Sequence, residues 1–389
     1  MKSVIAMDDY KSWDRLIAHC DTIEGFSALE REQTKRALSF LRAELGDSFL
    51  ATAMETRHPF VSNVFNLAPW TRKWLKSFAD ELRLAKSSVG FESMRTRILD
   101  GRRYGEAVQV LHVAAAFRRQ GFQITIDPQL PNEAEASVPD LLLTDGATGD
   151  RIYLEVSALN ESELACGAYE TSNRIHAPIW RGVPFLQFAA RIHKALAPRH
   201  LEEIVTRVEQ LVEVAKTDKA FAHLSIDGVL EIGISPESDK AMLEQWAATR
   251  GLTVGTLSGP PVRVDELQRI RSKIRKKQYQ LPGDLPGIVV VLTNHLFPWV
   301  KEHRALIGEL EEAVYDHGHL LAAVVGGSYI GGGMLPDELL MHGQHIYLRK
   351  TTCEILVEEY VVLLNQFCDH KVSASSITKL YNAFKPEPA

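Results

Sequence analysis

The run IVVVLT at residues 288–293 does not alternate between polar and apolar side chains. A strand with one face in water alternates, so this run predicts a strand that is covered on both faces. Helices are the usual cover for such a strand, which makes an α/β fold the expected class. From residue 101 onward, helical segments and short β-rich runs follow one another, in agreement with this class.

The size and composition of the chain favour a globular protein of more than one part. At 389 residues, the chain exceeds the length at which a single hydrophobic core stops growing, so two domains or one domain with large additions are expected. Hydrophobic residues at 45% and charged residues at 24% argue against a disordered, fibrous or coiled-coil protein. The formal net charge of -6 is mild and does not indicate a particular partner.

Targeting and redox signals are also informative. The first residues, MKSVIAMDDYKSWDRL, lack a signal-peptide core, and no stretch approaches the roughly 20 apolar residues of a membrane span. We therefore expect a cytoplasmic protein without a membrane segment. The cysteines lie far apart and lack metal-ligand spacing, so buried thiols are expected rather than a zinc site.

The order of expected elements suggests three parts. Residues 1–100 form a helical N-terminal region, residues 101–350 an α/β core, and residues 351–389 a C-terminal helical extension. In the core and extension, helices are expected at 106–120, 184–197, 201–216, 264–281, 354–367 and 376–384. Strands are expected at 122–126, 140–144, 152–157, 223–234, 288–293, 320–325 and 346–349.

Two carboxylates on neighbouring strands carry the strongest chemical signal. Asp140 follows Pro139 at the start of one strand, and Glu155 lies near the end of the next one. Paired carboxylates can hold a hard divalent cation such as magnesium, which assists hydrolysis of phosphate esters. Structural alternatives are a turn cap for Asp140 and a simple ion pair for Glu155.

A lysine interrupts the apolar stripe of a basic helix. Ile270, Ile274, Lys277 and Leu281 follow helical spacing, which places Lys277 on the face turned toward the core. A buried ammonium needs a partner, and the Asp140 and Glu155 edge would provide one. The alternative is that Lys277 buries only its methylene groups and extends its charge into water.

Glu106 gives a similar signal on the helix expected at 106–120. It aligns with Val110, Val113 and Phe117, which predicts an inward position on an apolar face. The alternative is that it merely interacts favourably with the helix dipole.

Basic clusters provide candidate contacts to nucleic acid. Lys273, Arg271, Arg275 and Lys276 share the helix of Lys277 and would suit phosphate neutralisation, although a solvated basic face is the alternative. A second cluster, Arg95, Arg97, Arg102 and Arg103, precedes the core. Asn294 and His295 end the apolar strand and are expected to play a supporting role.

The ordered set Glu106, Asp140, Glu155, Lys277 and Gln280 resembles the PD-(D/E)xK nuclease superfamily over about residues 105–294. The usual lysine, two positions after Glu155, is replaced by Ser157. The set is similar to variants in which the lysine has migrated to a following helix that also carries a glutamine.

The resemblance implies a restriction-endonuclease-like core, with a central mixed β-sheet flanked by helices. It implies Asp140 and Glu155 as ligands of Mg²⁺ or Mn²⁺, Glu106 as an auxiliary ligand or base, and Lys277 as the group that orients the attacking water. Gln280 would position substrate or water.

The expected function is a Mg²⁺-dependent nuclease that hydrolyses phosphodiester bonds of DNA, in restriction, repair or phage defence. The alternative is a catalytically inactive descendant that binds nucleic acid or a protein partner. A homodimer, or a partner protein bound through the N-terminal helices, is compatible with both.

Overall fold

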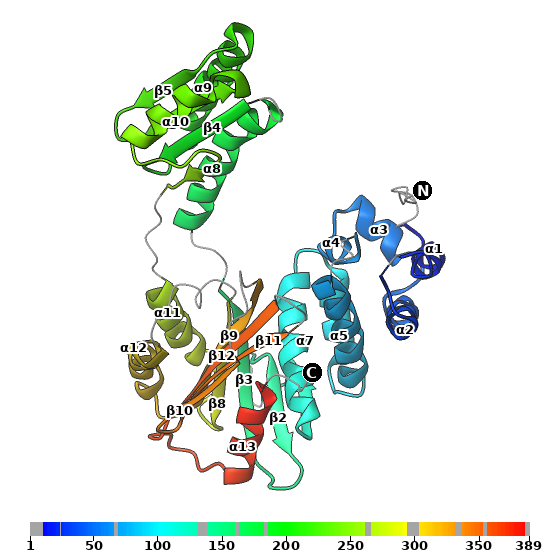
Figure 1. Ribbon diagram of the computed structural model, residues 1–389. Coiled ribbons are helices and arrows are strands. Elements are labelled where there is room, and N and C mark those ends of the chain that lie inside the picture. Colours follow the sequence, from blue (N-terminus) through cyan, green and yellow to red (C-terminus); the bar gives the residue numbers. More distant parts are fainter. Residues whose placement is uncertain are drawn as a thin grey trace. The chain divides into compact units, whose positions relative to one another are not determined.

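The computed structural model divides the chain into two compact units (Figure 1). The larger unit comprises Met1–Leu159 and Glu266–Ala389, and the inserted unit comprises Asn160–Asp265. The structure describes residues 11–23, 25–65, 69–130, 138–159, 163–182, 186–260, 266–293, 303–330, 337–352 and 356–385. Asn294 and His295 therefore lie outside the described residues.

An eight-stranded mixed sheet forms the centre of the larger unit. Its order is β1 (Phe122–Ile126), β2 (Leu141–Asp145), β3 (Arg151–Ala158), β8 (Gly287–Leu292), β9 (Leu320–Ile330), β12 (Leu356–Leu364), β11 (His345–Thr352) and β10 (Glu338–His342). β8 runs parallel to β3 and β9, whereas all other neighbours are antiparallel. The expected α/β class is confirmed at this level.

Both faces of β8 are covered, as its sequence predicts. Ile288 and Val290 belong to a core shared with α7 (Tyr104–Arg119) and the N-terminal helices. Val289 and Val291 belong to a second core shared with α11 (Glu266–Gln278) and α12 (His303–Tyr315). Since successive side chains of a strand point to opposite faces, a strand between two cores is apolar throughout.

The N-terminal region is helical in its described residues, as expected. It contains α1 (Trp13–His19), α2 (Ala28–Leu45), α3 (Phe49–Glu55), α4 (Phe60–Phe65), α5 (Pro69–Ala85) and α6 (Phe91–Leu99). A capping box starts α2, where the Ser27 hydroxyl accepts from the Glu30 N–H and the Glu30 carboxylate accepts from the Ser27 N–H. These helices pack through α5 and α6 against α7, which in turn lies on the sheet.

The inserted unit has its own sheet and core. Its elements are α8 (Glu163–Gly182), β4 (Leu186–Ile192), α9 (Pro198–Asp218), β5 (Ala222–Ile226), β6 (Leu230–Pro236), the short 3₁₀ helix η2 (Glu237–Asp239), α10 (Lys240–Thr249) and β7 (Leu257–Ser258). The strands pair in the order β5-β6-β4-β7. The sequence prediction of one core over 101–350 did not separate this unit.

Two expected helices are strands in the structure, and those predictions were wrong. Residues 186–192 form β4 within the expected helix 184–197, and residues 356–364 form β12 within the expected helix 354–367. β12 contains three valines and one tyrosine, which favour strands, and it pairs with β9 and β11 inside the sheet. Short apolar runs fit both periodicities, and the sheet neighbours decide between them.

The C-terminal residues 351–389 are therefore not a purely helical extension, because β12 is an inner strand of the main sheet. Only α13 (Ala374–Ala383) matches the expected helix 376–384. One expected strand, at 223–234, is instead the hairpin of β5 and β6, which turns near Gly228 with a φ of 62°. A positive φ is easily adopted by glycine, which makes a tight turn possible here.

Candidate functional site

Asp140 and Glu155 lie side by side, one just before a strand and the other within the strand paired with it. Asp140 directly precedes β2, where Leu141 pairs with Leu154 of β3, so Asp140 is brought next to Glu155. The Asp140 N–H donates to Glu155 Oε2 at 3.3 Å, and the Val156 N–H donates to Asp140 Oδ2 at 2.9 Å. The backbone of each strand thus holds the carboxylate of the other.

Lys277 reaches this acid pair from α11. Its Nζ lies 2.6 Å from Glu155 Oε1, and the Glu155 side chain is only 5% exposed. Ile270 and Ile274 of the same helix are buried against the sheet, which directs Lys277 toward the strands. The predicted convergence of Asp140, Glu155 and Lys277 is present in the structure.

Ser157 occupies the strand position two residues after Glu155, on the same face of β3. It is buried, and a hydroxyl supplies no positive charge. The Lys277 ammonium on the neighbouring helix provides the charge that the strand itself lacks.

Burial raises the pKa values of both carboxyl groups of the acid pair. Burial and the nearby Asp140 carboxylate raise the pKa of Glu155 to about 7, although the contact with Lys277 opposes this shift. Burial also raises the pKa of Asp140, against the opposing effects of the Val156 N–H and of Lys277. Burial disfavours the charged form of a carboxyl group and so raises its pKa. Carboxyl groups with raised pKa values are typical of functional sites.

This shift predicts a pH effect on stability. The pKa of Glu155 is higher in the folded state than its ordinary value of 4.5, so the folded protein loses stability as pH rises from 4.5 through about 7. The free energy of unfolding of Glu155→Gln, relative to that of wild type, should therefore be about 1–3 kcal/mol higher at pH 8 than at pH 5. Urea unfolding at both pH values measures this gain, and equal pH dependence in the two proteins would contradict it.

A second cation and a third acid complete the cluster. The Arg97 Nη2 of α6 donates to both oxygens of Asp127, at 3.0 and 3.1 Å, and Arg97 Nη1 lies 4.0 Å from Asp140 Oδ1. Arg97 belongs to a basic cluster noted in the sequence, whereas Asp127 was missed. Its position directly after β1, level with the start of β2, is the signal that identifies it.

Glu106 does not take the inward position that its spacing predicts. It is exposed in the first turn of α7, whereas Val110, Val113 and Phe117 are buried as expected. The first turn buries Tyr104 and Ala107 instead, so the apolar stripe does not extend to Glu106. Glu106 still lies near enough to Lys273 to oppose the lowering of the Lys273 pKa, which is caused mainly by burial and by Lys277.

Gln280 lies just beyond the end of α11, two residues before Pro282. Its side-chain oxygen is buried and has no hydrogen-bond partner in the described part of the chain. A buried amide oxygen without a partner is costly, so a water or ligand donor at this place would stabilise the site.

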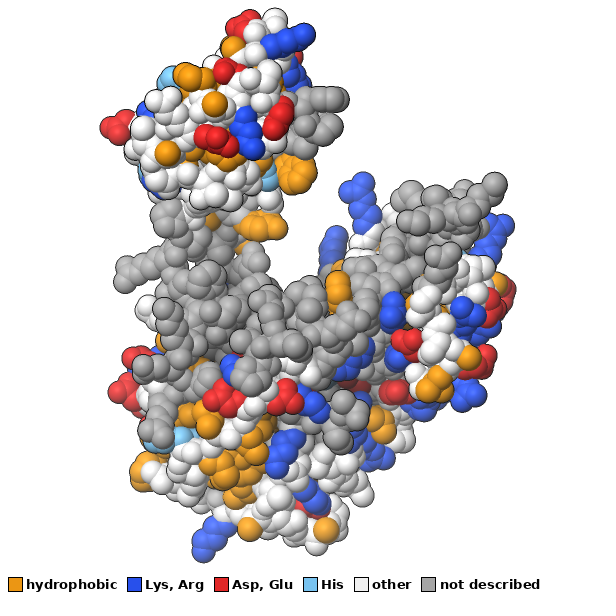
Figure 2. Space-filling view, viewed as in Figure 1, with side chains coloured by type: hydrophobic (Ala, Val, Ile, Leu, Met, Phe, Trp, Pro, Cys, Tyr) orange, Lys and Arg blue, Asp and Glu red, His pale blue; other side chains and the backbone are white. Residues whose placement is uncertain are grey.

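The other basic residues of α11 have different surroundings. Arg271 pairs with Glu312 and Glu309, and Arg275 pairs with Asp316, all on or next to α12. These two arginines therefore have acidic partners within the protein. Lys273 is half-buried and Lys276 is exposed. On the N-terminal helices visible in Figure 2, basic and acidic side chains are interspersed rather than arranged in a basic stripe.

The acid pair suits a magnesium ion, which keeps several water ligands, better than a metal whose ligands are all protein side chains. Among the described residues, no group of three or more His, Cys, Asp or Glu side chains is arranged to hold a metal ion. Magnesium is commonly bound through one or two carboxylates and keeps several waters, so Asp140 and Glu155 fit its requirements. A zinc ion, which prefers nitrogen and sulfur ligands, does not fit this pair.

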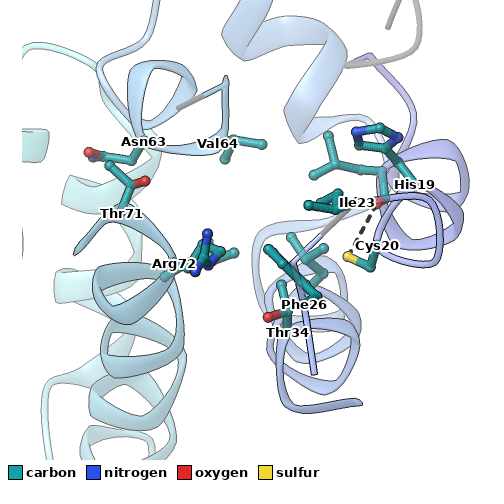
Figure 3. A pocket seen from close by; sticks show the side chains of 12 residues that line it. His19, Cys20, Ile23, Phe26, Thr34, Asn63, Val64, Thr71 and Arg72 are labelled. Atoms are coloured by element: carbon teal, nitrogen blue, oxygen red, sulfur yellow. Dashed lines mark hydrogen bonds between the residues drawn. The ribbon is translucent and has the colours of Figure 1, made fainter. Parts of the chain in front are cut away.

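A separate hollow lies among the N-terminal helices (Figure 3). It contains about 430 Å³ of empty space, part of it open to solvent, and its wall is mainly apolar, with Leu16, Ile23 and Phe26 among the lining residues. The Cys20 thiol donates to the Leu16 carbonyl at 3.6 Å, and burial raises its pKa. This hollow lacks paired carboxylates, so the acid pair remains the candidate site.

Comparison of the chain with protein-family models, with curated proteins and with solved structures gives no significant match. In the described ranges, no helix has the length and apolar character needed to span a bilayer.

Proposed function

We propose that this protein is a magnesium-dependent nuclease that hydrolyses phosphodiester bonds of DNA at Asp140, Glu155 and Lys277. The observation that carries the proposal is the 2.6 Å contact between the Lys277 ammonium and Glu155, which are 122 positions apart in the chain. This contact supports the resemblance to PD-(D/E)xK nucleases whose lysine has migrated to a helix.

The order of elements gives further support. Helix α7 precedes β1, β2 and β3, Asp140 directly precedes β2, Glu155 lies on β3, and α11 then carries the lysine and leads to β8. This arrangement of a mixed sheet between helices agrees with a restriction-endonuclease-like core. DNA is the proposed substrate because of this resemblance, and Mn²⁺ is expected to replace Mg²⁺.

The residues have distinct proposed roles. Asp140 and Glu155 would hold the cation, which when bound offsets charge on the phosphoryl group and activates a water. The backbone N–H groups of Asp140 and Val156 keep the two carboxylates in place. Lys277 would place its positive charge beside the reacting phosphate and orient the attacking water, and Gln280 would accept a hydrogen bond from that water or from the substrate.

The direct test uses supercoiled plasmid, single-stranded DNA and RNA, each with Mg²⁺ or with EDTA. Wild type is expected to cleave DNA only with Mg²⁺. Asp140→Asn, which keeps the size of the side chain, is expected to lose this cleavage because it removes a charged ligand. Circular dichroism checks that the variant remains folded. Preferential cleavage of RNA would change the proposed substrate, and absence of cleavage by wild type would overturn the enzyme proposal.

A non-catalytic binding protein is the second candidate. Ser157 in the usual lysine position favours it, because a serine hydroxyl supplies no positive charge to stabilise a reacting phosphate. Binding of an oligonucleotide by a wild-type protein that cleaves neither DNA nor RNA would support this alternative.

A further inference from the structure

Helix α6 is fixed against the strand edge that carries the acid pair. The Ile126 N–H at the end of β1 donates to the Val89 carbonyl at 2.8 Å, just before α6 begins. Gly90 follows with a φ of 84°, and a Cβ at this position would lie 2.2 Å from the Ile126 carbonyl oxygen. Such a close backbone approach is possible only for glycine, and it sets the position of α6 relative to β1.

Arg97 extends from α6 toward the acid pair and is held in a defined direction. Asp127 accepts two hydrogen bonds from its Nη2, and the Asp127 carboxylate also accepts from the Ser93 hydroxyl at 2.6 Å. Asp127 has a φ of 47°, and its N–H donates to the Asp140 carbonyl at 3.0 Å. Asp127, which orients Arg97, is thus hydrogen-bonded to the backbone of Asp140.

The Arg97 guanidinium has donors that these contacts do not use. A guanidinium carries five N–H donors, and the hydrogen bonds to Asp127 engage only Nη2. Nε is buried without a partner among the described residues, and Nη1 lies 4.0 Å from Asp140 Oδ1, beyond hydrogen-bond distance. The side chain is 11% exposed, and its buried Nε has little compensation from water.

Each carboxylate of the acid pair has one cationic side chain next to it. Lys277 contacts Glu155, and Arg97 lies beside Asp140. A phosphate chain that approaches two carboxylates is repelled unless cations lie beside them. Arginine is well suited to this role, because its planar donors match the oxygens of a phosphate.

We propose that Arg97, oriented by Asp127, binds a backbone phosphate of the nucleic acid next to the Asp140 and Glu155 pair. This inference rests on the proposed function, since it assigns a substrate contact to the same site. It also gives the N-terminal helices a part in substrate binding, because α6 belongs to them.

The test compares Asp127→Asn with the double variant Arg97→Gln/Asp127→Asn. Both variants lack the Asp127 charge. Removal of Arg97 in the double variant therefore does not leave an unpaired carboxylate at residue 127. Binding of a fluorescein-labelled DNA oligonucleotide is measured by fluorescence polarisation in EDTA, where metal-dependent cleavage cannot occur. The double variant is expected to bind about tenfold more weakly than Asp127→Asn, with a salt dependence lower by about one phosphate contact.

Two controls sharpen this comparison. Arg36→Gln removes one positive charge from α2, where the side chain is 80% exposed, and should leave binding unchanged. Arg97→Lys keeps the charge without the planar donors and should bind between wild type and the double variant. Equal binding by the double variant and Asp127→Asn would show that Arg97 only pairs with acids and would overturn the inference, as would absence of binding by wild type. Failure of the nuclease proposal appears separately, as absence of cleavage with Mg²⁺.

Discussion

Replacing Lys277 with methionine is expected to lower Mg²⁺-dependent DNA cleavage by about 10²–10³-fold, the usual cost of removing one charge-stabilising group. Methionine keeps most of the volume of the lysine stem but removes the ammonium that contacts Glu155 at 2.6 Å. The loss should appear in kcat rather than in KM, because the charge acts mainly on the transition state. Single-turnover cleavage at saturating protein measures this directly.

Lys371→Met is the matched control for this variant. Lys371 is exposed in the segment before α13, so the same substitution removes a charge away from the acid pair. It should cleave DNA at the wild-type rate. Lys277→Arg should retain part of the activity, because it keeps the charge but changes its geometry. Cleavage by Lys277→Met at the wild-type rate would show that the contact with Glu155 is only structural.

Replacing Lys379 with methionine is expected to destabilise the larger unit by about 2–3 kcal/mol, because a buried carboxylate loses its cation. Lys379 Nζ of α13 lies 2.8 Å from both oxygens of Asp145, whose side chain is 1% exposed. The Ser376 hydroxyl and the Ala147 N–H also donate to Asp145. This cluster attaches the C-terminal helix to the end of β2, so its loss should loosen both.

Thermal and urea unfolding at pH 7 measure this effect, again with Lys371→Met as control. The contact with Lys379 lowers the pKa of Asp145 to about 2 from its ordinary value of 3.8. The stabilisation is therefore complete above pH 3.8 and is lost as the pH falls toward 2. A Lys379→Met protein as stable as wild type at pH 7 would contradict this role of Lys379.

The site was predictable where a charged residue interrupts an apolar pattern. Lys277 in the stripe of Ile270 and Ile274 needed a buried partner, and Glu155 within an apolar strand needed a cation. The same reasoning was wrong for Glu106. Helical spacing gives the direction of a side chain but not where the packing partner of the helix ends.

Asp127 shows what sequence spacing alone does not supply. It follows β1 and reaches Asp140 only because β1 and β2 pair antiparallel, with Ile126 opposite Leu141. Its contact with Arg97 depends further on the packing of α6. Contacts of this kind come from tertiary structure, which local periodicity does not encode.

The fold was predicted best where one pattern excluded its competitors. The first strand, 122–126, has the predicted bounds, and the β-branched apolar run of β8 is a strand between two layers, as predicted. The segment of β12 fits both helical and strand spacing, and its position between β9 and β11 decides the outcome. The inserted unit begins and ends within the expected core, where no marked shift in composition separates it.

Calorimetric titration of Mn²⁺ into wild type and into Asp140→Asn at pH 8 shows whether the acid pair binds the cation before any substrate is present. At this pH, Glu155 is mainly ionised because its pKa is about 7. We expect wild type to bind one Mn²⁺ ion and Asp140→Asn to lose at least tenfold in affinity. Equal binding by the two proteins, or no binding by wild type, would contradict a metal site at Asp140 and Glu155.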